Sequence, residues 1–540
     1  MTIITPSAPD IILFNGTIAT QNPRQPDARA VAVGSGRILA VGKDNDVLAL
    51  DTAGAETVDL DGRLVVPGFI DAHIHFYEWA LNRQGVRLDD LTCIEELVAR
   101  LRQSARTRPE DQWIMGQGWN ETDWTEPLMP TRDVLDQAVP QHPVLLWRCD
   151  LHLAAANSAA LALAGIDADT PDPPEGRIER DTAGIPTGIL RELAINLVRD
   201  AFAPPDLDQV IRAFESATAA LHRRGVTGIV DVRLMADKDG ARALQAFQKM
   251  DAEGNLSLRT WVSLPGEQLD AIIGLGLRTG FGNDRLRIGH VKFFSDGGMG
   301  ARTAWMIDPF LDAGCGMPLI PMDQLAEKVL RADAAGLSVM VHAVGDRANR
   351  ELVNLFADLE SRTGRHGPAI AHRIEHVQMI RPEDARRLGD LNLALCVTPS
   401  NMVLDMNLID TVVGEKGQWS YAFRRLMDSG AAVMFSSDCP VCDPAPLPAI
   451  HAAVTRQRTD GTPENGWHPH ERVRVDEALM AYTATPAAVH RAYDLGVIAA
   501  GHKADLAVLS GNILTAPWSA IPEIGIAMTV FDGRIVYRNF

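Results

Sequence analysis

Short apolar runs alternate with amphipathic stretches through the middle of the chain. Apolar runs rich in β-branched residues are typical of buried strands, and helical spacing between them indicates βα units around a parallel sheet. Strands are predicted at 64–76, 225–232, 286–294, 337–344, 371–377, 394–399 and 432–436, and helices at 211–224, 325–335, 385–388 and 421–429. With 144–147 taken as the remaining strand, the pattern predicts an α/β fold, a (β/α)8 TIM barrel over residues 67–484.

The two ends of the chain have a different pattern. Short strands are predicted at 11–13, 30–33, 38–41, 58–60, 505–509, 526–531 and 534–537, separated by turn-forming Ser-Gly and Asp-Gly pairs. Because chain termini often lie close together, residues 1–66 and 485–540 are predicted to form one small β-sandwich domain. The alternative is two unrelated β caps.

A long segment interrupts the barrel pattern at residues 81–200. It exceeds what one βα unit needs and contains several defined turns. Insertions of this kind tend to cover binding sites, so this one is predicted to lie over the barrel mouth.

Two histidines lie at the end of the first barrel strand. Side chains alternate along a strand, so His73 and His75 point to the same side and form half of a divalent metal site. The alternative is a pair of core histidines satisfied by hydrogen bonds. The Pro67-Gly68 pair interrupts regular structure just before the histidines, and Asp71 lies on the same face as they do. Both observations favour the metal site.

Three further candidates end later apolar runs. His342, His376 and Asp438 lie where successive strands finish, and active sites of this barrel lie at the C-terminal ends of strands. Each residue alone has a simple structural explanation, such as a solvated strand end or a turn. Together with His73 and His75 they form a nitrogen and oxygen donor set suited to zinc or another divalent ion.

The stretch Pro-Gly-Phe-Ile-Asp-Ala-His-Ile-His at 67–75 resembles the first-strand signature of the amidohydrolase superfamily, metal-dependent hydrolases built on a TIM barrel. Later stretches resemble the YtcJ-like branch, which includes N-substituted formamide deformylase. The segment 501–509 is similar to the superfamily's C-terminal return strand, and 81–200 is similar to the branch's insertion over the barrel mouth. The chain departs from the branch at Leu151, usually glycine, and at Ala155, often aromatic, so specificity cannot be copied from relatives.

Lys292 lies in an apolar strand that opens into a glycine-rich loop. A buried lysine is costly unless its charge is paired or removed. The resemblance implies N6-carboxylation at this position of the fourth strand. It then implies two ions, one held by His73, His75, Lys292 and Asp438, the other by Lys292, His342 and His376. An ammonium paired with Asp296 or Asp231 is the alternative, and it leaves a site for one ion.

The predicted activity is hydrolysis of a C–N bond in a small amide. A bound divalent ion lowers the pKa of water from about 15.7 to about 7 and so provides hydroxide for attack on an amide-like carbonyl. Asp438 is the predicted proton shuttle. His152 resembles the family's substrate-facing histidine and is predicted to bind the carbonyl oxygen. The predicted substrate contacts, each equally compatible with packing, are Trp119, Trp124, Arg302 and Trp305.

The composition of the chain limits the classes of partner that the protein is expected to bind. A net charge of −19 argues against nucleic acid or an anionic membrane as the main partner. Six scattered cysteines do not indicate a disulfide framework, and Cys439-Pro-Val-Cys442 is interpreted as packing rather than as a second zinc site. The first residues lack a signal-peptide pattern and no apolar run is long enough to span a bilayer, which predicts a cytoplasmic protein. A homodimer is the prior expectation.

Two other functions stay open at this point. An ester or lactone could be hydrolysed at the same metal site. A barrel that has lost turnover could instead act as a binding or regulatory protein, although such a protein would not need Asp438 as a proton shuttle.

Overall fold

Eight parallel strands form the central sheet of the computed structural model, which describes residues 8–50, 54–83, 85–109, 112–202, 204–235, 240–363 and 370–540. In sheet order they are β8 (Phe69–Ile74), β15 (Val226–Asp231), β16 (Arg259–Pro265), β17 (Leu286–Phe294), β18 (Val339–Ala343), β19 (His372–His376), β20 (Leu393–Val397) and β21 (Ala432–Phe435). The backbone N–H of Asp438 donates to the His73 carbonyl at 2.9 Å, and that of His75 to the Cys439 carbonyl at 2.8 Å. These bonds join the last strand's end to the first, giving the predicted (β/α)8 barrel.

The predicted eighth strand was wrong. Residues 144–147 belong to β11 (Val144–Arg148), in a separate sheet, and the missing barrel strand is β16. All seven residues of β16 are buried although it begins with Arg259. The guanidinium of Arg259 is bound by the carboxylates of Asp505 and Asp532, more than 240 residues later in the chain. Because the partners of Arg259 lie so far along the chain, the local sequence pattern does not show that this strand is buried.

Strands from both ends of the chain form two further sheets. A six-stranded sheet has the order β24 (Arg534–Arg538), β23 (Ile526–Phe531), β22 (Leu506–Leu509), β7 (Leu64–Pro67), β2 (Thr17–Ala19) and β3 (Asp27–Ala28). A four-stranded sheet has the order β5 (Arg37–Gly42), β4 (Ala30–Gly34), β1 (Ile11–Phe14) and β6 (Glu56–Asp59). Antiparallel pairing of β7 with β22 joins the two ends of the chain, and one apolar cluster includes residues of both sheets. The domain boundaries at 66, 67, 484 and 485 stay predictions.

Gly68 marks the passage from the terminal sheet to the barrel. It separates β7 from β8, so the run at 64–76 is two strands in different sheets. A Cβ at this position would lie 2.2 Å from Oγ1 of Thr227, and the Gly68 N–H donates to the Asp505 carbonyl. Only glycine permits this close approach, which fixes where the strand carrying His73 begins.

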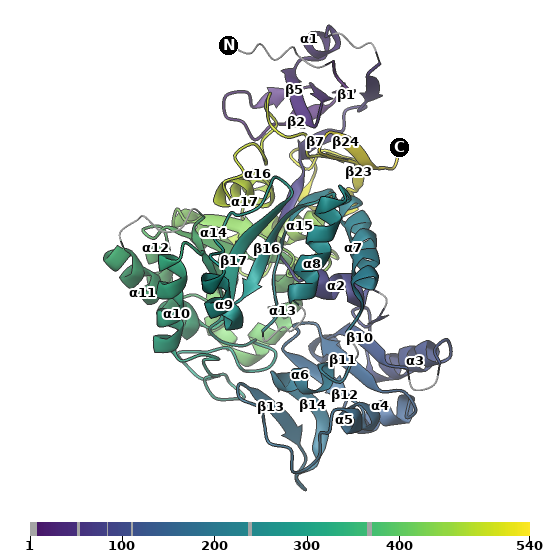
Figure 1. Ribbon diagram of the computed structural model, residues 1–540, viewed down its shortest axis with the longest axis vertical. Coiled ribbons are helices and arrows are strands. Elements are labelled where there is room, and N and C mark those ends of the chain that lie inside the picture. Colours follow the sequence, from purple (N-terminus) through teal and green to yellow (C-terminus); the bar gives the residue numbers. More distant parts are fainter. Residues whose placement is uncertain are drawn as a thin grey trace.

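The insertion has its own sheet and core at the end of the molecule opposite to both termini (Figure 1). Its strands, in sheet order, are β13 (Gly176–Arg180), β14 (Pro186–Glu192), β12 (Leu153–Ala156), β11, β10 (Ile114–Trp119) and β9 (Val86–Arg87). Its helices are α3 (Ile94–Ala105), α4 (Arg132–Ala138), α5 (Ser158–Leu163) and α6 (Ala194–Arg199).

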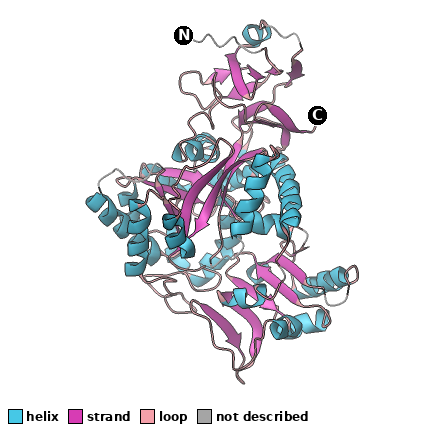
Figure 2. Ribbon diagram, viewed as in Figure 1, coloured by secondary structure: helices cyan, strands magenta, loops and turns pink. Residues whose placement is uncertain are grey.

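Helices cover the outside of the barrel, as Figure 2 shows in cyan. They are α2 (Phe76–Asn82), α7 (Leu207–His222), α8 (Gly240–Ala252), α9 (Leu269–Gly274), α10 (Met322–Ala334), α11 (Asp346–Thr363), α12 (Pro382–Leu388), α13 (Pro399–Val412), α14 (Phe423–Asp428), α15 (Pro446–Thr455), α16 (Val475–Tyr482) and α17 (Ala484–Val489), with α1 (Asp44–Leu48) in the terminal domain. Among the described helices, none combines the length and apolarity that crossing a membrane requires. Residues 1–7, on which the signal-peptide expectation partly rests, lie outside the described residues.

Candidate metal centre

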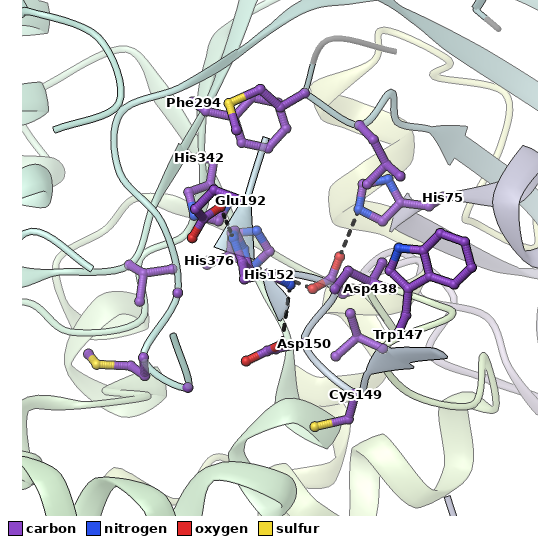
Figure 3. Close-up of a pocket in the computed structure, with 18 of the residues that line it drawn as sticks. His75, Trp147, Cys149, Asp150, His152, Glu192, Phe294, His342, His376 and Asp438 are labelled. Carbon is purple, nitrogen blue, oxygen red and sulfur yellow. Dashed lines mark hydrogen bonds and ion pairs between the residues drawn. The ribbon is translucent and has the colours of Figure 1, made fainter. Parts of the chain in front are cut away.

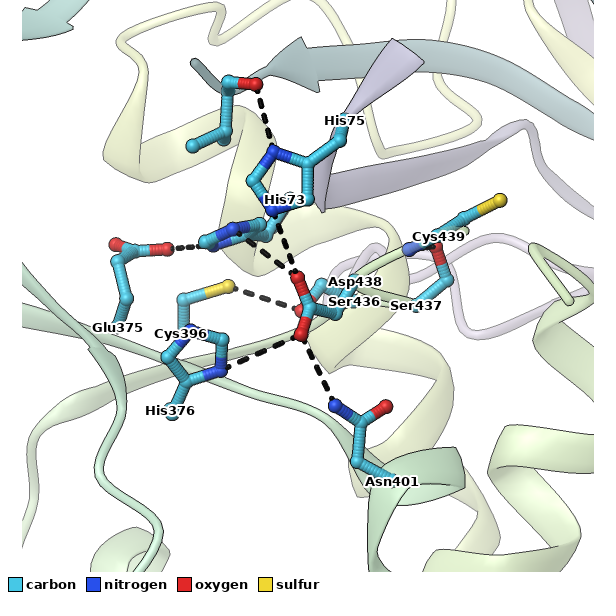
Figure 4. A network of polar contacts seen from close by, with 12 residues as sticks. His73, His75, Glu375, His376, Cys396, Asn401, Ser436, Ser437, Asp438 and Cys439 are labelled. Carbon is cyan, nitrogen blue, oxygen red and sulfur yellow. Dashed lines mark hydrogen bonds and ion pairs between the residues drawn. The ribbon is translucent and has the colours of Figure 1, made fainter. Parts of the chain in front are cut away.

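His73, His75 and Asp438 converge at the mouth of the barrel. Their ligand atoms all lie within 4.8 Å of one another, and all three residues are buried. Nε2 of His73 and Nε2 of His75 lie 3.4 and 3.3 Å from Oδ1 of Asp438. Figure 4 shows the Asp438 carboxylate at the centre of this group, where barrel closure brings the last strand's loop beside the first strand.

Hydrogen bonds at the outer ring nitrogens orient both histidines. Nδ1 of His73 lies 2.5 Å from Oε2 of Glu375, and because an ionised carboxylate only accepts, the imidazole donates. Burial alone would raise the pKa of Glu375, but the Arg373 guanidinium holds it below its ordinary value. Nδ1 of His75 donates to the Val232 carbonyl at 2.9 Å. Both Nε2 atoms are therefore free to face Asp438, the arrangement typical of metal-binding histidines.

Three buried polar atoms at this point have no hydrogen-bond partner among the described residues. They are Nε2 of His73, Oδ1 of Asp438 and Nζ of Lys292. Burying such groups without a hydrogen bond costs free energy, so they indicate a bound ligand that the protein itself does not supply. Imidazole nitrogens beside a carboxylate oxygen fit a divalent cation.

His342 and His376 extend the group. The His376 ring centroid lies 4.7 Å from that of His342 and 5.1 Å from that of His73, and Nδ1 of His376 is 3.9 Å from Oδ2 of Asp438. Burial lowers the pKa of His73, His342 and His376 well below its ordinary value. Neutral imidazole is the form that binds a metal, so these three histidines are in a suitable state. All five histidine and aspartate residues predicted from the sequence therefore lie together at the barrel mouth.

Two of these residues have unusual backbones. His376 has φ 68° and Asp438 has φ 55°, both in the left-handed region that non-glycine residues rarely adopt. Val377, a β-branched residue next to His376, has φ 44°. Conformations of this kind cost about 1–3 kcal/mol each and cluster at functional sites. Asp71 does not join the donors but holds the loop, because its carboxylate accepts from the backbone and hydroxyl of Ser437.

Lys292 lies beside this group on β17 and is 2% exposed. Its Nζ is 4.6 Å from the centroid of the Phe294 ring. Burial lowers the pKa of Lys292 to about 8, although Glu375 and Asp438 oppose this change. Neither alternative partner is available to it: Asp296 accepts from three backbone N–H groups, and Asp231 is bound by Arg233.

His152 faces the metal ligands from the insertion. Its ring centroid lies 5.3 Å from that of His342, and Nδ1 lies 2.8 Å from Oε2 of Glu192. Burial opposes the charged form, but the Glu192 carboxylate outweighs it and raises the pKa of His152 to about 9. Thr303 donates to the other Glu192 oxygen at 2.5 Å and so fixes the carboxylate. Leu151, next to His152, has φ 63°, a backbone conformation that glycine adopts more readily than leucine.

One cavity of about 110 Å³ contains these groups (Figure 3). Its wall includes His75, His152, Lys292, His342, His376 and Asp438, together with apolar side chains such as Trp147, Phe294 and Met299. The four predicted substrate contacts are not in this wall. Trp119 and Trp124 pack in the core of the insertion, Arg302 pairs with Asp312, and Trp305 packs against the barrel core.

Residues 56–537 match the Amidohydrolase family. The chain belongs to the amidohydrolase family. It is 30% identical over 488 positions to putative amidohydrolase YtcJ of Bacillus subtilis, covering 90% of this chain and 91% of that protein. It is also 30% identical over 552 positions to N-substituted formamide deformylase of Arthrobacter pascens, covering 98% of each. An uncharacterized metal-dependent hydrolase from Pyrococcus horikoshii has a similar crystal structure, with a TM-score of 0.74, 28% identity, and coverage of 94% and 99%.

Membership of the family makes this chain a metal-dependent hydrolase. Two carboxylates of the amidohydrolase site had not been predicted from the sequence. Glu375 orients His73, and Glu192 orients His152. Glu375 could have been suspected because it precedes His376 in a strand with a second charged residue, Arg373. Glu192 lies 40 residues from His152, so no local signal connects them.

The cysteines of this amidohydrolase do not form a second metal site among the described residues. His73, Glu375 and Cys396 lie close together, but Nδ1 of His73 and the carboxylate of Glu375 already bind each other. All six cysteines are free, and the Cys442 thiol donates to Oδ1 of Asn401 at 3.1 Å. The same amide donates to Oδ2 of Asp438 at 3.1 Å, so Cys442 lies next to the centre as a packing residue.

Proposed function

We propose that this amidohydrolase hydrolyses a C–N bond in a small amide or formamide, with zinc as its metal. The convergence of His73, His75 and Asp438 around buried atoms without partners carries this proposal. Ester or lactone hydrolysis would use the same groups, and the substrate screen below separates these activities.

The donors that would hold the metal are His73, His75, Lys292, His342, His376 and Asp438. A divalent ion bound there supplies a water whose pKa falls to about 7 and polarises the substrate carbonyl. Lys292 is suited to carboxylation because a lowered pKa leaves more of the amine neutral and able to add carbon dioxide. With the carbamate, the donor set would accommodate two ions, since Lys292 is near enough for its charge to lower the pKa of both His73 and His342. Without it, one ion is expected.

Asp438 is the proposed proton shuttle. Burial would raise its pKa, but the neighbouring His75 imidazole, with His73 and Lys292, holds it below its ordinary value, so the carboxylate is ionised at neutral pH. Asn401 fixes Oδ2, while Oδ1 faces the histidines. Asp438 accepts the proton of the attacking water and delivers it to the leaving nitrogen.

His152 is the proposed donor to the carbonyl oxygen. Its Nδ1 is held by Glu192, so Nε2–H is the atom left to stabilise the negative charge that develops on the oxygen. The ring is fixed from the insertion side, opposite the metal ligands.

A substrate screen tests the function. N-formyl, N-acetyl and N-acyl-amino-acid compounds, with esters and lactones in parallel, are incubated with zinc-loaded protein and with Asp438→Asn as blank. We expect hydrolysis of at least one amide and a loss of about 100- to 10,000-fold in the variant. If only esters or lactones are hydrolysed, the protein is an esterase or lactonase and the proposed amide hydrolysis is wrong. No turnover of any compound by protein that binds metal would favour a binding or regulatory role.

A further inference from the structure

A second and larger cavity adjoins the metal-centre cavity. Its volume is about 740 Å³, against 110 Å³ for the first. Three side chains line both cavities: Cys149 of the insertion, Leu404 of α13, and Val441. The Val441 N–H donates to the Asp438 carbonyl at 2.9 Å, so the shared wall lies one turn from the proposed proton shuttle.

The metal-centre cavity is too small for more than the reacting group and a few neighbouring atoms. By the same measure a single water needs about 10–15 Å³, so 110 Å³ holds on the order of ten water-sized groups before any metal is bound. Pockets for drug-sized ligands measure about 300–1,000 Å³, a range that the second cavity falls into. The part of a larger substrate beyond its scissile bond therefore needs the second cavity.

The chemistry of the second cavity favours an uncharged, apolar group. Its lining includes Trp79, Val86, Leu88, Leu91, Val403, Pro440 and Pro448. It also includes four arginines and four aspartates, whose formal charges cancel: Arg83, Arg87, Arg224, Arg458, Asp89, Asp123, Asp443 and Asp460. The best-formed pair, Arg224 with Asp443, is bidentate at 2.8 and 2.6 Å. Arg87 likewise pairs with Asp89, and the lining as a whole carries no net formal charge to select an ionic ligand.

Polar contacts fix the two walls of this cavity to each other. One wall belongs to the insertion and the other to α13, α15 and the loop after Asp438. Nε2 of Gln117 donates to the Pro440 carbonyl at 2.9 Å, and Nδ2 of Asn407 donates to Oδ1 of Asp123 at 3.2 Å. The insertion therefore does more than cover the metal centre, because it also encloses this adjoining space.

We propose that the second cavity binds the apolar substituent, an alkyl chain or ring, of the same amide whose C–N bond lies at the metal centre. This proposal rests on the proposed function. The substituent passes the wall of Cys149, Leu404 and Val441 and extends between the insertion and α13. Substrates with long apolar substituents are then preferred over short ones.

A chain-length series tests the proposal. Linear N-alkylformamides and N-alkylacetamides from propyl to octyl are compared in wild type, Val403→Trp and Ser400→Phe, two half-buried positions of α13 that line only the second cavity. Val98→Trp, on a half-buried position of α3 outside both cavities, is the matched control. Wild type and control should gain about fourfold in kcat/KM per added methylene over part of the series. In the two α13 variants the gain should fall below twofold.

The outcomes separate this proposal from the function on which it rests. A wild-type rate independent of chain length, or an unchanged gain in both α13 variants, would overturn the second cavity as a substituent site while leaving amide hydrolysis intact. If no amide of the series is hydrolysed, the proposed function fails. N-octylformamide then serves as a probe in calorimetry, where binding at least tenfold weaker in the α13 variants supports the site and equal binding overturns it.

Discussion

The carboxylate of Glu375 lies 2.5 Å from Nδ1 of His73, on the side of the ring that faces away from Asp438. Glu375 is itself held by two hydrogen bonds from Arg373, each of 2.8 Å. A buried ion pair thus fixes the ring and the tautomer of a proposed metal ligand without touching the metal site. Partners of this kind usually contribute 10- to 100-fold to metal affinity.

Replacement of Glu375 by glutamine should weaken zinc binding by about 10- to 100-fold, because the amide is a poorer acceptor and leaves Arg373 without its counter-charge. Zinc affinity is measured by competition with a chromophoric chelator. Glu383→Gln, which removes a surface carboxylate paired with Arg350, is the control and should bind zinc as wild type does. Equal affinity in E375Q and wild type would contradict the orienting role.

The pH profile should depend on Glu192. The pKa of His152 is raised from 6.5 to about 9, so its protonated form, the proposed donor, persists up to about pH 9 and is lost above it. In Glu192→Gln the descending limb of kcat/KM should move toward 6.5, a loss of about thirtyfold at pH 8. His152→Ala should lose about 100- to 1,000-fold throughout. A profile that does not move in E192Q would exclude this pairing as the cause.

Lys292→Met should stabilise the metal-free protein while it reduces metal content and activity. Burial lowers the pKa of Lys292 from 10.5 to about 8, so the unfolded state binds this proton more tightly. The buried Lys292 charge therefore lowers the free energy of unfolding by its full amount below about pH 8, and this destabilisation disappears as the pH rises to 10.5. Methionine removes it at similar volume, an increase on the order of 1–3 kcal/mol in the free energy of unfolding at pH 7.

Denaturant unfolding of chelator-treated wild type and variant at pH 7 and pH 10 measures this effect. A gain at pH 7 that shrinks at pH 10 is expected, and a variant less stable than wild type at pH 7 would contradict it. In the untreated protein, mass spectrometry should find wild-type chains heavier by one carbon dioxide, lost on acid treatment and absent in K292M.

Local pattern in the sequence was sufficient to find the five histidine and aspartate residues that converge at the barrel mouth. His73 and His75 follow from strand alternation, and His342, His376 and Asp438 from their positions at the ends of apolar runs. Their convergence follows from the barrel itself, because parallel strands bring their C-terminal ends to one face. The strand at 286–294 was predicted with the bounds of β17, whose buried residues are consecutive although His290 and Lys292 are among them.

Other features depend on contacts that no local pattern contains. Residues 144–147 of β11 are apolar because the insertion has a core on each face of its sheet, so this strand resembles a barrel strand. Arg259 makes β16 look exposed until Asp505 and Asp532 are placed beside it. Trp119 was predicted either to contact substrate or to pack, and it is fully buried in the insertion core.

Metal content per chain shows directly whether His73 and His75 hold a catalytic ion. Purified wild type should contain one or two divalent ions by elemental analysis, and His73→Ala/His75→Ala should lose both metal and hydrolase activity. The chain offers a matched control in His468-Pro469-His470, a second His-x-His sequence outside the metal-centre cavity, so His468→Ala/His470→Ala should keep both. A H73A/H75A protein with wild-type metal content and activity would show that these histidines do not bind the catalytic metal.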